Sequence, residues 1–188
     1  SYPGFGQSMS FGGIYMNKQI ERIIKSLKIR SSNGQKSFEI FQLERLPVNV
    51  TCKFYSEATS EELKKLKKIG LPSDYLDFLR LTNGLELFDE GCGMGVNCHI
   101  YSVKEVFQVR DFMKNSGFWS EYDFASKFPI LRLRDIGDIY IDRVKYISGE
   151  DYLSYPLPDN NFFQFGFAEW LERYVVSEGN EFWYFLNP

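Results

Sequence analysis

Three segments in the first half of the chain carry apolar residues at the three- and four-residue spacing of amphipathic helices. The first spans residues 17–28 and begins with Asn17, a residue type that caps helix N-termini. The second begins at a capping box at residues 59–62 and ends at Gly70, which can adopt the left-handed conformation that closes a helix. The third follows at once, with Pro72 in its first turn, where proline loses no hydrogen bond. Its buried stripe and its end are predicted at Leu71, Tyr75, Phe78, Leu79, Asn83 and Gly84.

Period-two alternation and turn signals predict strands in much of the remaining sequence. Residues 38–44 and 50–55 form one predicted hairpin, and a second hairpin turns at residues 135–137. The order of helices, then a sheet, then a closing helix predicts an α+β fold with a mixed, mainly antiparallel sheet flanked by N-terminal helices and a closing C-terminal helix. The other predicted strands are residues 85–88, 98–103 and 144–148, and the other predicted helices are residues 103–114 and 167–175.

The first residues differ in composition from the rest of the chain. Residues 1–15 are rich in Gly and Ser, and Met16 begins a segment typical of a protein start. We interpret residues 1–15 as a vector-derived remnant or a disordered arm and exclude them from the fold. No internal repeat or linker is visible, so residues 16–188 are expected to form a single domain.

Composition narrows the class of protein. The chain is 44% hydrophobic and 18% aromatic, which excludes an intrinsically disordered protein. No stretch approaches the ~20 apolar residues of a membrane span, and no signal peptide is visible. The three cysteines form an odd set, which favours reduced thiols over disulfides. The sequence therefore predicts a cytoplasmic protein.

Charge is distributed unevenly along the chain. Residues 16–68 carry 12 Lys and Arg against 6 Asp and Glu, whereas residues 69–188 carry 10 against 19. The acidic region disfavours direct binding of nucleic acid, which depends on neutralising phosphates. It suits a basic protein partner, and the alternative is surface charge without a specific partner.

Candidate catalytic and metal-ligating residues are few. His99 is the sole histidine and follows Cys98, but neighbours in a strand point to opposite faces and cannot form a nucleophile–base pair. Cys92 could approach His99 across the glycine-rich loop at residues 89–97, although a structural thiol is the more ordinary interpretation. These three side chains lack the close spacing of a zinc site, and the loop lacks the Gly-Lys-Ser/Thr end of a phosphate-binding loop. The sequence therefore predicts no catalytic machinery, no cofactor and no metal.

The segment "ATSEELKKLKKIGLPSDYLDFLRLTNGLELF" resembles the signature of the SUKH superfamily, in particular its Smi-one/Knr-four family. Segments similar to the family's follow in the same order: "IYSVKEV", then "DIGDIYID" with Gly137 and Asp138, then "FGFAEWLERYV" with Trp170. The resemblance covers roughly residues 57–176, with the helix at 17–28 as the usual leading helix. The positions that match in the first segment are Glu61, Glu62, Leu66, Gly70, Leu71, Pro72, Tyr75, Phe78, Leu79, Asn83 and Gly84.

The resemblance implies a binding protein rather than an enzyme. Bacterial SUKH members are mostly immunity proteins that neutralise polymorphic toxins, often nucleases, and fungal relatives regulate cell-wall synthesis. We therefore expect a bacterial immunity protein that binds one toxin tightly and stoichiometrically. One alternative is a regulatory scaffold that binds endogenous enzymes or cell-wall synthesis machinery. A third hypothesis is an enzyme or metal protein that uses Cys92, Cys98 and His99.

The sequence departs from the family pattern in three places. Residues 29–56 resemble an insertion with two extra strands, residues 177–188 add an apolar tail, and the glycine-rich loop at 89–97 has no counterpart. Partner recognition could lie in any of the three.

Individual partner-binding residues are predicted from charge and aromatic content. Phe118, Trp119 and Tyr122 follow a turn at residues 115–117, and we expect them either to form an exposed contact surface or to be buried in the core. Acidic residues that could attract a basic toxin are Asp89, Glu90, Glu121 and Asp123.

Overall fold

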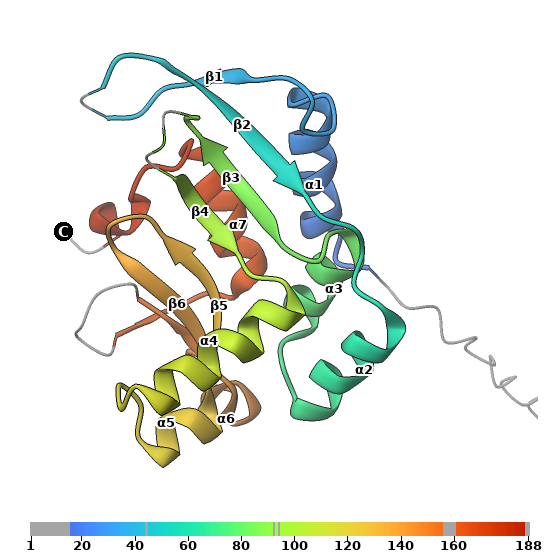
Figure 1. Ribbon diagram of the computed structural model, residues 1–188, viewed down its shortest axis with the longest axis vertical. Coiled ribbons are helices and arrows are strands. Elements are labelled where there is room, and N and C mark those ends of the chain that lie inside the picture. The colour runs from blue at the N-terminus through green and yellow to red at the C-terminus, as the bar shows by residue number, and fades with distance from the viewer. Residues whose placement is uncertain (1–15, 44, 92, 94, 156–160, 187–188) are drawn as a thin grey trace, which may run out of the picture.

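Eight strands lie side by side in the order of the chain, and every neighbouring pair is antiparallel (Figure 1). A computed structural model describes residues 16–43, 45–91, 93, 95–155 and 161–186, and these strands lie within that part of the chain. The predicted α+β fold is confirmed, with an entirely antiparallel sheet in place of a mixed one. The strands are β1 (Phe38–Ile40), β2 (Val48–Phe54), β3 (Leu85–Asp89), β4 (Val96–Ile100), β5 (Lys127–Leu133), β6 (Gly137–Asp142), β7 (Leu153–Ser154) and β8 (Phe162–Phe163).

Three helices lie together against one face of the sheet, behind the strands in Figure 1. They are α1 (Lys18–Arg30), α3 (Ser73–Leu81) and α7 (Phe167–Val176). The others are α2 (Ser60–Ile69), α4 (Val103–Asn115), α5 (Glu121–Ser126), α6 (Arg143–Ile147) and a short 3₁₀ helix, η1 (Phe182–Phe185).

Two carboxylates of α3 join this helix to the other two. Asp77 Oδ2 accepts a hydrogen bond of 2.8 Å from the backbone N–H of Asn17, at the start of α1. Asp74 Oδ2 accepts one of 2.9 Å from the backbone N–H of Ala168, at the start of α7. Both carboxylates therefore satisfy orphan N–H groups and lie at the positive end of a helix dipole.

The segment that resembles the SUKH signature forms a structural core, as its pattern predicts. The capping box of α2 is present and Gly70 has a φ of +90°. Tyr75 and Phe78 are fully buried, and their rings pack edge-on against Phe167 of α7, with centroids 5.2 and 5.4 Å away. After the end of α3, Asn83 Oδ1 accepts a hydrogen bond of 2.9 Å from Val103 N, which joins the segment to the start of α4.

A β-bulge in β3 turns one aromatic side chain towards the covered face of the sheet. Thr51 pairs with Asp89 and Lys53 pairs with Glu86, so β3 contains one more residue than β2 across this interval. Phe88 has a φ of +59°, which is unusual for a bulky residue, and its side chain is fully buried.

The opposite face of the sheet carries a row of polar side chains across five strands. Lys53, Glu86, His99, Arg132 and Asp138 are successive register partners from β2 to β6. Lys53 Nζ lies 3.3 Å from a Glu86 carboxylate oxygen, and Arg132 Nε lies 3.2 Å from Asp138 Oδ1. Asp138 also accepts a hydrogen bond from the hydroxyl of Tyr101. Opposite charges across neighbouring strands stabilise such a sheet modestly.

One predicted strand is wrong. Residues 144–148 were expected to be extended, but residues 143–147 form α6. The carboxylate of Asp142 accepts hydrogen bonds from Val144 N (3.0 Å) and Lys145 N (3.2 Å) and thereby caps a helix. Val144 and Ile147 are exposed, so the alternation of apolar and polar residues did not reflect a buried strand face.

Two other differences concern elements that the sequence pattern did not indicate. The six-residue helix α5 is too short to show a helical period, although Ser120 and Asp123 form its capping box. The two-residue strands β7 and β8 flank a proline-containing segment, and residues 156–160 of that segment lie outside the described residues. The predicted hairpin in the insertion is confirmed, with β1 shorter than expected.

No helix in the described part of the chain is long and apolar enough to cross a lipid bilayer.

We predict that Phe78→Ala lowers the free energy of unfolding by about 3–5 kcal/mol, because a fully buried ring is replaced by a cavity. Urea unfolding followed by circular dichroism would measure the change. A variant that keeps its stability yet loses partner binding would instead place Phe78 in a contact surface.

Candidate functional site

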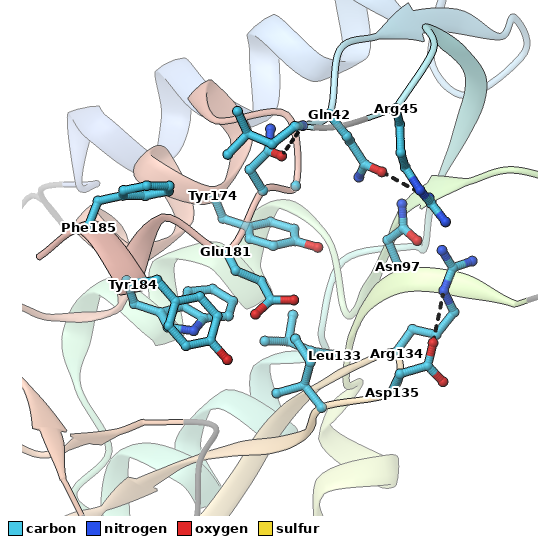
Figure 2. Close-up of a pocket in the computed structure, with 15 residues that line it drawn as sticks. Gln42, Arg45, Asn97, Leu133, Arg134, Asp135, Tyr174, Glu181, Tyr184 and Phe185 are labelled. Carbon is cyan, nitrogen blue, oxygen red and sulfur yellow. Dashed lines mark hydrogen bonds and ion pairs between the residues drawn. The ribbon is translucent and has the colours of Figure 1, made fainter.

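The three segments that the SUKH resemblance leaves unmatched meet around one cavity of about 750 Å³ (Figure 2). Gln42, Leu43 and Arg45 come from the β1–β2 connection, in the insertion. Asn97 comes from the end of the glycine-rich loop, and residues 179–185 come from the tail. The turn between β5 and β6 completes the wall with Leu133, Arg134, Asp135 and Ile136.

A shared carboxylate joins three segments at one side of the cavity. Glu90 Oε1 lies 2.9 Å from Arg134 Nη2 and 3.3 Å from Arg45 Nη1. Arg134 also donates a hydrogen bond of 3.1 Å to the backbone carbonyl of Gly95. The hydrogen bond from Arg134 lowers the pKa of Glu90 below its ordinary value of 4.5. We call Glu90, Arg45 and Arg134 the Glu90 clasp.

The tail holds the insertion through hydrogen bonds that replace a strand pairing. Asn180 Oδ1 accepts from Leu43 N at 2.8 Å, and Asn180 Nδ2 donates to the carbonyl of Phe41 at 3.2 Å. Glu178 accepts from Phe41 N at 2.5 Å and pairs with Arg30 at 2.8 Å. These side chains satisfy the backbone beyond β1, which explains why β1 ends earlier than its apolar pattern predicts.

The floor of the cavity is aromatic. Tyr174 and Trp183 are 2% exposed, and the ring of Trp170, fully buried, stacks on Tyr174 with centroids 5.0 Å apart. The indole N–H of Trp183 has no hydrogen-bond partner among the described residues. Burial raises the pKa of Tyr174 well above its ordinary value, so its hydroxyl stays protonated at neutral pH.

Glu181 places a carboxylate inside the cavity. Figure 2 shows it between Tyr174 and Leu133, with Tyr184 close by and the Glu90 clasp residues Arg45 and Arg134 across the open space. Burial and the neighbouring Glu181 carboxylate raise the pKa of Tyr184. The rim above is apolar and exposed, and we call Leu43, Tyr184 and Phe185 the apolar rim.

The predicted partner-binding residues do not form one surface. Asp89 and Glu90 lie at the end of β3, beside the cavity, where Glu90 belongs to the clasp and Asp89 accepts a hydrogen bond from Gly91 N at 2.9 Å. The group Phe118 to Asp123 lies on and before α5, at the far end of β5 (Figure 1). The seven residues of β5 separate the two places by about 20 Å.

The aromatic residues near α5 are partly exposed. Phe118 and Tyr122 are 70% and 66% exposed, and the Phe118 ring lies 6.5 Å from that of Phe112, itself exposed. Trp119 is half-buried, with its ring edge-on to Tyr140. Phe118 and Tyr122 are therefore exposed rather than buried in the core. We call Phe112, Phe118 and Tyr122 the α4–α5 patch.

The acids beside this patch already have cationic neighbours. Asp123 Oδ1 lies 2.7 Å from Lys127 Nζ, which lowers the pKa of Asp123. Glu121 lies 3.3 Å from Lys114 Nζ. Their charges are therefore partly compensated within the protein, which weakens the field that they present to a basic partner.

Cys98 and His99 lie on opposite faces of the sheet. Cys98 is fully buried on the covered face, whereas His99 is partly exposed on the other face, with Nε2 at 3.1 Å from Glu105 Oε1. Burial raises the pKa of Cys52 to about 11 and also raises the pKa of Cys98, so neither thiol is a thiolate at neutral pH. Cys92 lies outside the described residues.

No group of three or more His, Cys, Asp or Glu side chains in the described ranges is placed to hold a metal ion. The cavity contains carboxylate, hydroxyl and guanidinium groups on aromatic walls. This arrangement is suited to recognition of a polar or charged group through contacts that need no chemical step.

Sequence patterns did not indicate the most informative cavity residues. Arg134 and Glu181 match no motif, and Tyr174 was indicated only as a residue of the predicted closing helix. The sequence indicated only the three unmatched segments as candidates for partner recognition, without individual residues. The structure brings these segments together around the cavity.

Comparison with known proteins adds one distant relative. No family model matches the chain. The chain is 25% identical over 122 residues to the uncharacterized protein YobM of Bacillus subtilis (strain 168). The match covers 62% of this chain and 63% of the relative, so the chain spans less than two thirds of that protein's length. This degree of similarity does not assign a family.

We predict that Glu90→Gln lowers the free energy of unfolding at pH 7 by on the order of 1 kcal/mol, because a charge-assisted hydrogen bond is weakened. The folded-state pKa of Glu90 is lowered, so its stabilisation is present above pH 4.5 and is lost as pH falls through the folded pKa. Urea unfolding should show that the stabilities of variant and wild type converge as the pH falls below the folded-state pKa of Glu90. Glu121→Gln removes an exposed partner and serves as a control with little effect. If Glu90→Gln loses as much unfolding free energy at acidic pH as at pH 7, the ion pair is not the source of the stabilisation.

We also predict that Gly179→Ala destabilises the junction between tail and insertion. Gly179 has a φ of +82°, and an added Cβ would lie 2.9 Å from Phe88 Cδ2. We expect a loss of about 1–3 kcal/mol and faster hydrogen exchange at residues 41–43. Gly117→Ala has a similar positive φ with no atom within 4 Å, so it controls for backbone strain alone. Identical effects of the two substitutions would exclude a role for the Phe88 contact.

Proposed function

We propose that this protein is an immunity protein that neutralises a polymorphic toxin by tight one-to-one binding. The proposal joins the SUKH resemblance of the scaffold to a single structural observation. The three segments that the resemblance leaves unmatched converge on one cavity with an exposed apolar rim. A common scaffold that carries divergent segments at one surface is the arrangement expected of proteins that each recognise a different partner.

The surface has the composition of a binding site for protein. Leu43, Tyr184 and Phe185 are 62%, 56% and 70% exposed and surround partly buried polar groups. Exposed apolar side chains beside desolvated charges are typical of the centre of protein interfaces. Leu46, in the same connection, is 85% exposed and extends the apolar area.

A second candidate function is a regulatory scaffold that binds endogenous enzymes or cell-wall synthesis machinery. The α4–α5 patch favours it, because this patch lies at the other end of β5 from the cavity. Two separate apolar surfaces would allow two partners to bind at once.

The test is capture of partners from the source organism with tagged protein, followed by mass spectrometry. We expect one toxin fragment to be held at a one-to-one ratio. Leu43→Ser combined with Phe185→Ser should abolish its capture, and Phe112→Ser combined with Tyr122→Ser, a matched pair of exposed substitutions, should leave it unchanged.

Capture of housekeeping or cell-wall enzymes that depends on the α4–α5 patch would favour the scaffold. Failure to retain any toxin, with the folded protein in excess, would exclude the immunity function.

A further inference from the structure

The charges that line the cavity leave one carboxylate without a cationic partner. Arg45 and Arg134 both pair with Glu90, and Asp135 lies 3.9 Å from Arg134 with its side chain 92% exposed. Among the described residues, no cationic side chain forms an ion pair with Glu181, and its polar neighbour is the Tyr184 hydroxyl, whose pKa burial and the Glu181 carboxylate raise. With Glu90 included, the charged residues around the cavity sum to one net negative charge.

The Glu181 carboxylate lies among aromatic rings. Tyr174, Trp183 and Tyr184 line the same cavity as Glu181, and Figure 2 shows Tyr174 and Tyr184 on either side of it. Aromatic faces carry negative potential and attract cations, and a carboxylate between them strengthens that attraction. This combination selects a cationic group over a neutral or anionic one.

A guanidinium fits these walls better than an ammonium. It is planar, so it stacks on aromatic rings, and its parallel N–H groups match a carboxylate in a bidentate pair. It is also less strongly hydrated than an ammonium, which lowers the cost of entering a partly buried cavity. The cavity volume of about 750 Å³ lies in the range of small-molecule binding pockets, so it can hold a guanidinium side chain.

We propose that the cavity accepts an arginine side chain of the partner protein, which pairs with Glu181 and stacks against Tyr184. The identity of the partner rests on the proposed function, since a toxin that acts on nucleic acid is a basic protein. The Glu90 clasp contributes separately, because it neutralises Arg45 and Arg134, which would otherwise repel the incoming guanidinium.

The first experiment needs no toxin. Nα-acetyl-L-arginine N-methylamide is titrated into the protein, and the indole N–H signal of Trp183, assigned with Trp183→Phe, is followed by NMR. We expect a saturable shift with a dissociation constant in the millimolar range, on the order of 1–10 mM. The norleucine and glutamate analogues should cause no saturable shift.

Two substitutions separate the Glu181 carboxylate from general charge. Glu181→Gln should weaken probe binding about tenfold, as expected for loss of one desolvated charge pair. Asp135→Asn removes the same charge from the exposed rim and should change binding less than about twofold. Asparagine is well suited to position 135, where φ is +63°. Unchanged spectra outside the cavity would verify that both variants are folded.

The inference is overturned if the arginine probe gives no saturable shift, if Glu181→Gln binds it as well as wild type, or if the glutamate analogue binds instead. The last result would mean that an acidic group displaces Glu90 from the clasp.

With a captured toxin the same variants distinguish the two proposals. If Glu181→Gln binds the toxin as tightly as wild type and the arginine analogue causes no saturable shift, the arginine site is overturned. The immunity function is then unaffected. Probe binding that depends on Glu181, without any retained toxin, would support the cationic site and exclude the immunity function.

Discussion

The buried ring of Phe88 is the contact on which the arrangement of the cavity depends. The bulge turns this side chain from the strand towards Phe38 of β1 and Tyr174 of α7, with ring centroids 6.2 and 5.9 Å away. A bulky residue with positive φ costs about 1–3 kcal/mol. Full burial of the ring contributes about 1.5–3 kcal/mol, and each aromatic pair adds about 0.5–1.5 kcal/mol, so the packing offsets the strain. Phe88 thereby packs the insertion against α7, and Gly179 of the tail lies beside the same ring.

The two faces of the sheet have different roles because of this packing. On the covered face, burial raises the pKa of thiols such as Cys98, so they stay protonated at neutral pH. On the other face, Lys53, Glu86, Arg132 and Asp138 pair with one another across the strands. Their charges are compensated within the sheet, whereas Glu181 in the cavity has no cationic partner among the described residues. A partly buried charge without a cationic partner, beside apolar surface, is the stronger indication of a binding site, since burying a charge without an ion pair is costly.

Much of the scaffold could be predicted from local pattern. Some features depend only on neighbours within a few positions, so a single sequence is enough to recognise them. They include the apolar stripe of α1, the capping boxes of α2 and α4, and the turn at residues 135–137. The strand expected at 144–148 failed because a period of two over five residues does not distinguish a strand from a short exposed helix capped by Asp142. The helix α5 was missed because one turn and a half shows no period.

The sequence by itself determined the α+β class, the helices of the scaffold and the segments in which recognition could lie. Only the tertiary structure decided that these segments form one cavity, because Asn180 bonds to residues 41 and 43, Glu90 bonds to Arg45 and Arg134, and Phe88 contacts both sides. Each of these interactions joins residues more than 40 positions apart. Contacts of that kind depend on the positions of whole elements in space, and no local pattern of residues encodes them.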